Sequence, residues 1–522
     1  MRISRGKRNG KASVFAEFVQ HRKKTCRNYG AAGLILLGGM LATFAVRAAD
    51  NLPASVSGAL RAAGIEQNDV SFEVWGVGEE YPRLTWRSRV PRNPASVMKL
   101  LTTGLALEQW GPARTWQTVV RRSPVEGKAV TLAVVGSGDP DLTLARWEGL
   151  WRQVYQQGMT HVADLLLDGA QSEGVTDAFD GQGFRAYNVI PTFLQVDQQT
   201  QWLWVRPGKQ GGDPVEIWSD FPFPRQQWVN HVVTRAGPCP SLWREDLHYR
   251  IHASGASQIL ASRPSAELDR GLVVEWAGTV SQACGPHVWG LSLLTNEGYL
   301  AATFETLWHE LGGDWEGGVH SASADAAWTE VALTESRPLE EILMDMNRNS
   351  NNVMARMLLR DLVQDSAVAT AGSSSCDSQC VVRAMLRQRG LDFPELVLDN
   401  GAGLSRRSSI SVDSLVRWLK WMQENSRYGR EFAVTLPEAG IEGTVKQGLE
   451  ELRGKRFRLK SGTLNGVKGV AGYGRDAEGH EVVLALLVNG AHAERAGAVE
   501  RALLRWISSE SKMPQPGSRL AE

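Results

Sequence analysis

The stretch NPASVMKLLTTGLALEQWG, residues 93–111, places Ser96 and Lys99 at the start of an apolar run with helical spacing. Pro94 precedes the run and Gly111 follows it, as is typical of the start and end of a helix. Positions i and i+3 share a helix face, so the two polar side chains can meet. A serine is a poor nucleophile until a base takes its proton, and lysine becomes that base only if burial or a nearby cation lowers its pKa from about 10.4. The apolar neighbours that would provide burial are Val97, Leu100, Leu101 and Leu105.

The S-x-x-K pattern is weak evidence when it stands alone, because it also occurs at Ser4/Lys7 and at Ser509/Lys512. Only the match at Ser96 opens an apolar helix after a proline-rich approach. A capping serine and a lysine that extends to solvent remain the alternative interpretation.

Two further motifs strengthen the catalytic interpretation. SNN places Ser350 and Asn352 in a polar break between two helical patterns, and KSGT begins at Lys460. Singly, the first could be a helix cap and turn, and the lysine could be exposed on a strand. Chance rarely produces S-x-x-K, S-x-N and K-[ST]-G in this order.

The regions around the motifs predict a sheet packed against helices. Residues 69–77 and 83–90 indicate two short strands ahead of the first motif. KRFRLKSG alternates apolar with basic residues, which predicts a half-buried strand with Lys460 on its polar side. The segments 468–475 and 480–490 can pair with it as an antiparallel meander, and residues 494–509 can cover the sheet as a helix.

The ordered motif set is that of penicillin-binding proteins and class A β-lactamases. With GSGDPDLT, NSNNVMARMLL, GAGLSR, LPEAGIEGT and KSGTLNGVKGVAGY, the chain resembles the D-alanyl-D-alanine carboxypeptidase/endopeptidase family, the class C low-molecular-mass penicillin-binding proteins, from about residue 55 to 505. The resemblance implies an α/β (α+β) fold of the penicillin-binding/β-lactamase-like transpeptidase type. In that fold an antiparallel sheet is flanked by helices, and this family adds inserted, mainly-β domains.

The resemblance also implies roles for the motif residues. Ser96 would attack the carbonyl of the penultimate D-alanine and form an acyl-enzyme, with Lys99 as the base. Ser350 would relay the proton to the leaving amine, and Asn352 would hydrogen-bond the substrate's peptide backbone. Lys460 would supply positive potential.

The third motif would bind the end of the substrate. The side chains of Ser461 and Thr463 would meet a terminal carboxylate, and the backbone N–H groups of Ser96 and Thr463 would form the oxyanion hole. Gly462 would let the strand approach the substrate closely. Ser461 stands where the family more often has Thr, and Ala402 stands where it often has Ser, so we expect only a shaping role for the turn at Ala402.

The spacing of the motifs predicts the domain organisation. Ser96 and Ser350 are 254 residues apart, more than a compact catalytic domain needs. We expect a catalytic domain formed by 49–114 and 326–507, interrupted by an inserted, mainly-β region at 115–325 that makes one or two small domains. The inserted region, including VDQQTQWLWV, resembles the family least. Residues 508–522 are expected to be a disordered tail.

The first 48 residues predict export. They hold ten of the 57 basic residues and one of the 57 acidic ones, followed by an apolar segment and a small-residue exit at Ala48. We interpret them as a signal peptide cleaved near Ala48, which implies a periplasmic protein, with an uncleaved membrane anchor as the alternative. The remainder has a net charge of −9, which argues against nucleic acid as a partner.

The cysteines after the leader would lie in an oxidising compartment. Among the three possible pairings we favour Cys239–Cys284 with Cys376–Cys380, and free thiols are the alternative. No C-x-x-C or HExxH pattern predicts a metal site, and we expect no cofactor.

The sequence therefore predicts a serine-type DD-peptidase, a carboxypeptidase, an endopeptidase or both, that acts on peptidoglycan stem peptides and takes β-lactams as covalent inhibitors. One alternative is a non-catalytic wall-binding protein on the same fold. The other is a β-lactamase, which no Glu-x-x-x-Asn deacylation element supports.

Overall fold

The structure is a computed structural model, and it describes residues 52–124, 127–171, 179–255, 260, 271–325, 327–366 and 376–509. The predicted leader, residues 1–48, lies outside these ranges. Among the described helices none is long and apolar enough to cross a membrane. The last helix includes Ser508 and Ser509, which the sequence assigns to the tail, and the rest of the tail is outside the described residues.

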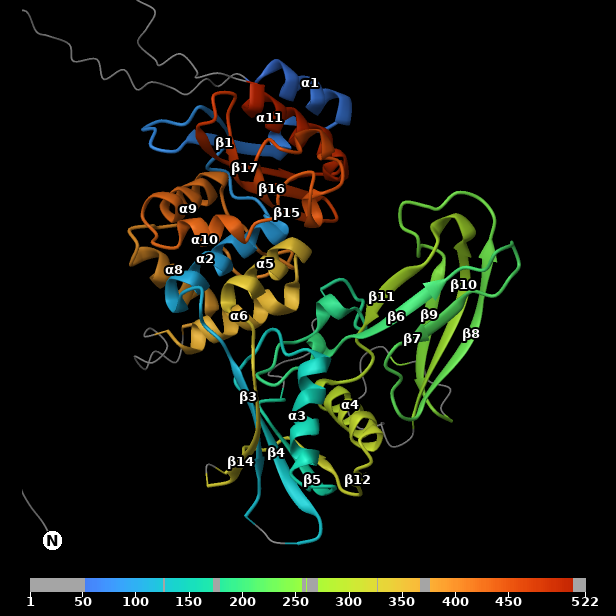
Figure 1. The fold of residues 1–522 in the computed structure, drawn as a ribbon. Coiled ribbons are helices and arrows are strands. Elements are labelled where there is room, and N and C mark those ends of the chain that lie inside the picture. The colour runs from blue at the N-terminus through green and yellow to red at the C-terminus, as the bar shows by residue number, and fades with distance from the viewer. Residues whose placement is uncertain are drawn as a thin grey trace, which may run out of the picture. The chain divides into compact units, whose positions relative to one another are not determined.

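A five-stranded antiparallel sheet joins the two ends of the chain (Figure 1). Val70 pairs with Val488, so the first strand lies against the last one. The predicted meander and the two predicted early strands are confirmed as neighbours in this sheet. In spatial order the strands are β15 (Arg458–Leu464), β16 (Val467–Arg475), β17 (Glu481–Asn489), β1 (Val70–Gly76) and β2 (Leu84–Trp86).

Two terminal helices cover one face of this sheet, α1 (Ala54–Ala63) and α11 (Gly497–Ser509). Their apolar residues recur at helical spacing and pack in one cluster with the inward side chains of the strands. Because successive strand residues point to opposite faces, the same strands also present apolar side chains to a second cluster on the other side.

The second cluster is built on α2 (Lys99–Trp110), which contacts α6 and lies beside α5 (Figure 1). Nine of the twelve residues of α2 are buried, which accounts for its apolar composition on all sides. The other helices of this layer are α5 (Leu339–Asn349), α6 (Asn352–Gln364), α8 (Ser378–Arg387), α9 (Val412–Glu424) and α10 (Gly429–Val434).

Between α2 and α5 the chain forms three further sheets. The first has the order β12-β5-β4-β3-β14, with β13 also paired to β5, and it packs with two helices around tryptophans. Its elements are β3 (Gln117–Arg122), β4 (Val130–Gly136), α3 (Leu144–Gln156), β5 (His161–Asp168), α4 (Asn296–Glu310), β12 (Asp314–Trp315), β13 (Val319–His320) and β14 (Thr329–Glu335). This stretch therefore contains helices as well as strands, and its last strand ends beyond residue 325.

The other two sheets have three strands each. One has the order β11 (His287–Leu291), β6 (Gln201–Arg206) and β7 (Glu216–Ser219), all antiparallel. The second has β8 (Gln226–Arg235) and β9 (Leu247–Ala253) on either side of β10 (Leu272–Ser281).

The segment GSGDPDLT holds the first of these sheets to the helical layer. Asp141 accepts hydrogen bonds from Arg337, and the same guanidinium reaches Asp345 on α5 at 2.6 Å. Asp139 is buried and pairs with Arg146 at 2.7 Å. These contacts fix the start of α5, the helix whose other end carries the SNN motif.

Candidate active site

The turn that carries Ser96 is a 3-10 turn, Ala95–Met98, that leads into α2 at Lys99, rather than the α-helical start expected from the sequence. Ala95 has a positive φ of 47°, a conformation that is costly for a residue with a side chain. Asn93 stabilises the turn: its side chain accepts from the N–H of Ala95 at 2.9 Å, and its backbone exchanges hydrogen bonds with Asn489 at the end of β17.

Two glycines let other segments press against this turn. A Cβ on Gly462 of β15 would lie 2.6 Å from the carbonyl oxygen of Pro94 and 2.8 Å from the amide nitrogen of Ser96. A Cβ on Gly403 would lie 1.8 Å from the carbonyl oxygen of Ala95. From the sequence we expected Gly462 to let the strand approach the substrate. In the structure the absence of a side chain at Gly462 also lets β15 contact the turn that carries Ser96.

Lys99 is fully buried and touches three oxygen atoms. Its Nζ lies 3.0 Å from Ser96 Oγ, 2.6 Å from Asn352 Oδ1 and 2.8 Å from the carbonyl oxygen of Ala402. Burial lowers the pKa of Lys99 well below 10.5, and the charge of Lys460 lowers it further. A neutral amine has two N–H groups and one lone pair, so donation to Asn352 and Ala402 leaves the lone pair for the hydroxyl proton of Ser96.

Ser350 and Lys460 form the second pair. Ser350 ends α5 with a positive φ of 55°, which turns the chain into α6 and projects the motif from between the helices. Lys460 Nζ donates to Ser350 Oγ at 3.0 Å and to the carbonyl oxygen of Ser461 at 2.8 Å. Burial lowers the pKa of Lys460 to about 7.

Lys460 is fully buried, so its expected place on the polar side of a half-buried strand is wrong. The reason is that both faces of β15 are covered here, one by the sheet's core and the other by the turn of Ser96. Within the described residues neither Lys99 nor Lys460 has an ion pair with a carboxylate. Two buried amines without a counter-charge favour their neutral forms.

The other residues of the third motif lie at the rim of this site. Ser461 Oγ donates to Thr444 Oγ1 at 2.7 Å, and Thr463 Oγ1 accepts from Lys468 Nζ at 3.4 Å. Thr463 and Thr444 are exposed, whereas Ser461 is buried.

The structure thus brings Ser96, Lys99 and Asn352 into one hydrogen-bonded group and Ser350, Lys460 and Ser461 into a second. Sequence reasoning missed the carbonyl of Ala402, since a backbone acceptor leaves no trace in residue type. It also missed Thr444, although LPEAGIEGT belongs to the resemblance. The side-chain oxygen of Asn352 accepts a hydrogen bond from Lys99, and the expected bond from Asn352 to the substrate backbone stays a prediction.

The long stretch between the motifs reaches the site through a short turn. Asn351, between the two SNN motif residues, donates to Gln198 Oε1 at 2.6 Å. Gln198 is the centre of three successive residues with positive φ, Asp197 to Gln199. A run of left-handed residues that are not glycine is strained, and here the strained turn lies against the motif.

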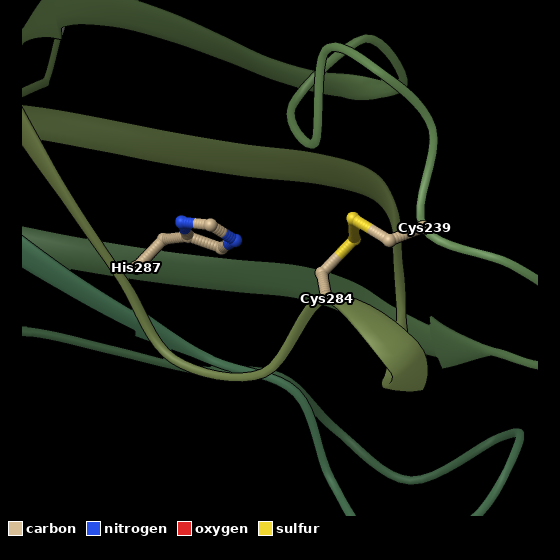
Figure 2. Close-up of side chains that lie close together, drawn as sticks. All are labelled: Cys239, Cys284 and His287. Atoms are coloured by element: carbon tan, nitrogen blue, oxygen red, sulfur yellow. A yellow bond between two sulfur atoms is a disulfide. The ribbon is translucent and has the colours of Figure 1, made fainter. Parts of the chain in front are cut away.

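The four cysteines after the leader pair as Cys239–Cys284 and Cys376–Cys380, the pairing favoured from the sequence. Among the described residues one group has metal-ligand spacing, Cys239, Cys284 and His287, with ligand atoms within 4.8 Å of one another (Figure 2). The two sulfurs are bonded to each other, and thiolates are what a metal ion would require. The group therefore acts as a crosslink.

The chain is similar to known proteins over most of its length. The model of the D-Ala-D-Ala carboxypeptidase 3 (S13) family matches residues 52–510. A D-alanyl-D-alanine carboxypeptidase from Actinomadura sp. (strain R39) is 26% identical over 78% of the chain and 76% of its own length. D-alanyl-D-alanine carboxypeptidase DacB from Haemophilus influenzae is 24% identical over 69% of the chain and 72% of its own length.

Solved structures show the same fold. The crystal structure of penicillin binding protein 4 from Haemophilus influenzae superposes with a TM-score of 0.69 at 19% identity, over 87% of this chain and 99% of that one. A second structure of that protein, in complex with a β-lactam, gives a TM-score of 0.65 at 18% identity, over 88% of this chain and 100% of that one. The penicillin-binding/β-lactamase-like transpeptidase fold expected from the sequence is confirmed.

Proposed function

Since its residues 52–510 match the family model, the chain belongs to the D-Ala-D-Ala carboxypeptidase 3 (S13) family, and we propose that Ser96 and Lys99 are the nucleophile and the base of its reaction. The chain is a serine-type DD-peptidase. The observation that carries the assignment of roles is the surroundings of Lys99: it is buried, its pKa is lowered, and it lies 3.0 Å from Ser96 Oγ.

Acylation begins when Lys99 takes the hydroxyl proton of Ser96 as Oγ attacks the carbonyl carbon of the penultimate D-alanine. Asn352 and the Ala402 carbonyl hold the amine by its two N–H groups, so its lone pair stays directed at the hydroxyl. The developing oxyanion is bound by the backbone N–H groups of Ser96 and Thr463. Loss of one such donor costs about 100- to 1000-fold in rate.

The leaving D-alanine departs as its C–N bond breaks and its nitrogen receives a proton from Ser350, which in turn takes up the proton that Lys99 removed from Ser96. The 3.0 Å hydrogen bond from Lys460 to Ser350 Oγ supports this relay, because it stabilises the alkoxide character that the serine gains while donating. Lys460, Ser461 and Thr463 bind the terminal carboxylate, with Thr444 holding the hydroxyl of Ser461. Water then hydrolyses the ester on Ser96 and releases the shortened peptide.

The substrate is the stem peptide of peptidoglycan, and β-lactams acylate the same serine because their strained amide resembles the scissile bond. We assign the chain to the periplasm, after removal of a leader near Ala48. We divide it into a catalytic domain and an inserted region, which the sequence places at 49–114 with 326–507 and at 115–325. We extend the inserted region to Glu335, because β14 pairs with β3. The paired cysteines support an oxidising compartment.

Labelling with a fluorescent penicillin tests the nucleophile. Wild-type protein should form a covalent adduct that persists for minutes or longer, and Ser96→Ala should form none. Ser509→Ala is the matched control, because Ser509 opens another S-x-x-K match far from the site. This control should label as the wild type does.

The alternatives have distinct outcomes. An unlabelled wild type would favour a non-catalytic wall-binding protein, and an adduct lost within seconds would favour a β-lactamase. With a stable adduct, release of free D-alanine from a pentapeptide and cleavage of a cross-linked dimer measure the carboxypeptidase and endopeptidase activities separately.

A further inference from the structure

Tryptophans on one side of the β11-β6-β7 sheet are exposed to solvent. The three strands are labelled in Figure 1. The inner side packs in the core through Leu203, Trp289 and neighbouring residues. On the outer side Trp204 pairs across the strands with Trp218 and Val288, and Trp202 lies two residues away on the same side. We name Trp202, Trp204, Trp218 and Val288 the tryptophan face.

Three of the four side chains of the tryptophan face are exposed to solvent, which is unusual for large apolar side chains. Trp202 is 50% exposed, Trp218 37% and Val288 45%. Large aromatic side chains usually contribute to stability by burial, and these do so only in part. Exposed aromatic clusters of this kind mark binding surfaces.

The three rings are held in place, so their exposed sides are preorganised. The indole N–H of Trp204 donates to Asp220 Oδ2 at 2.6 Å, and that of Trp202 hydrogen-bonds the carboxylate of Asp197. Trp218 stacks on Trp204 with 11° between the ring planes.

Gly290 lets Trp202 lie flat. It pairs with Trp202 across the strands, and a Cβ there would come within 2.9 Å of the indole ring. One side of the ring therefore rests on the backbone of β11 and the other is free for a ligand.

One ion pair and one hydrogen-bonded carboxylate border the tryptophan face. Arg206 pairs with Glu216 and lies 5.2 Å above the ring of Trp218, and Asp220 accepts from the indole N–H of Trp204. The face therefore offers flat rings with hydrogen-bonding groups at the rim. A neutral sugar fits this chemistry, since the C–H side of a pyranose packs on a ring while its hydroxyl and acetamido groups reach the rim. Four apolar side chains are few for a stable protein interface, which takes about 20–30 residues a side.

The tryptophan face begins beside the active site. Gln198 accepts from Asn351 within the SNN motif, and Trp202 follows four residues later, at most about 14 Å along an extended chain. In a pentapeptide stem, four residues separate the scissile bond from the sugar, again about 14 Å when extended. The stem peptide is therefore about as long as the stretch of chain that joins the Gln198 contact to Trp202.

We propose that the tryptophan face binds the glycan strand of peptidoglycan, the β-linked N-acetylated amino sugars that carry the stem peptide. This inference rests on the proposed function for its choice of polymer. It gives the enzyme a hold on the polymer in addition to its hold on the peptide end, so that glycan-attached stems are favoured over free ones.

Binding to glycan strands stripped of their stem peptides by an amidase tests the inference directly, measured by co-sedimentation with the full chain carrying Ser96→Ala. We expect the protein to bind these strands and Trp218→Ala to weaken binding about tenfold, as for loss of a central aromatic contact. Trp218→Tyr, which keeps a flat ring, should restore most of the affinity. Tyr81→Ala is the matched control, because Tyr81 is 54% exposed on the part of the chain with the catalytic sheet.

In proteins with an intact Ser96, Trp218→Ala should label with penicillin and hydrolyse free pentapeptide as the wild type does, while D-alanine release from intact sacculi falls several-fold. The inference is overturned if the wild type does not bind stripped strands, if Trp218→Ala binds them equally well, or if the variant only dissociates a dimer seen by sedimentation velocity. A protein that binds the strands but cleaves no pentapeptide would instead contradict the proposed function.

Discussion

Replacing Asn352 with Asp tests whether Lys99 acts as a neutral base. The side-chain oxygen of Asn352 lies 2.6 Å from Lys99 Nζ, and Asp has nearly the same shape with a negative charge. At an effective dielectric constant of about 20, two unit charges at that distance attract by about 6 kcal/mol. About 1.4 kcal/mol already changes a protonation equilibrium tenfold, so a quarter of that attraction is enough to raise the pKa of Lys99 by about one unit.

The expected result is a slow enzyme that recovers at high pH. Burial lowers the pKa of Lys99 in the wild type, and the new carboxylate raises it again. The base form exists only above that pKa, so the acidic limb of the acylation rate moves to higher pH. At neutral pH the rate of penicillin acylation should fall about 100-fold or more, the contribution of a general base. Stopped-flow measurement of acylation from about pH 6 to pH 10 records both effects.

Asn352→Ala is the control, because it removes the acceptor and adds no charge. It should slow acylation without moving the acidic limb to higher pH, and thermal melting establishes that both variants are folded. If Asn352→Asp keeps the limb of the wild type, or loses activity that high pH does not restore, Lys99 is not the base.

Three further predictions concern the surroundings of the site. Gly462→Ala forces β15 away from the turn of Ser96, so acylation should slow at least tenfold. The free energy of unfolding, measured in urea, should fall by about 1–3 kcal/mol. Gly58→Ala is the control: there is open space around its Cβ, so acylation should be unchanged. Thr444→Val should lower kcat/KM for pentapeptide about fivefold, because the hydrogen bond to Ser461 is lost. Thr444→Ser keeps the hydroxyl and should not lower kcat/KM. If both variants have the same effect, the hydroxyl of Thr444 does not contribute to substrate binding. Replacing Cys239 and Cys284 by Ser opens a loop of 45 residues, so the free energy of unfolding measured by calorimetry should fall by about 4 kcal/mol. Penicillin labelling should be unchanged. An unchanged melting temperature would contradict this prediction.

The sequence predicts the fold well where one physical rule dominates. The apolar run after Ser96 requires burial on all sides, and α2 is buried. The alternation of residues in the last strands requires an antiparallel sheet, and β15, β16 and β17 form it. The roles of the motif residues stay predictions until variants are measured.

The sequence fails where tertiary packing overrides a local pattern. Alternation placed Lys460 on a polar face, but the turn of Ser96 covers that face and buries the amine. The carbonyl of Ala402 could not be predicted, because any residue supplies a carbonyl and only the folded turn aims it at Lys99. The left-handed turn at Gln198 could not be predicted either, because none of its residues is a glycine, the residue that usually signals a positive φ.

The pairing of β1 with β17 determines when, during synthesis of the chain, the active site can form. Val70 and Val488 pair across 417 intervening residues. The pairing therefore has a large loop-closure cost, and we expect it to form late. During vectorial synthesis or translocation, the turn of Ser96 emerges early but meets β15 only when the last strands arrive. The intervening sheets can fold first as a unit. We therefore expect a chain cut short before β17 not to react with penicillin, because the sheet that places β15 against the turn of Ser96 is incomplete.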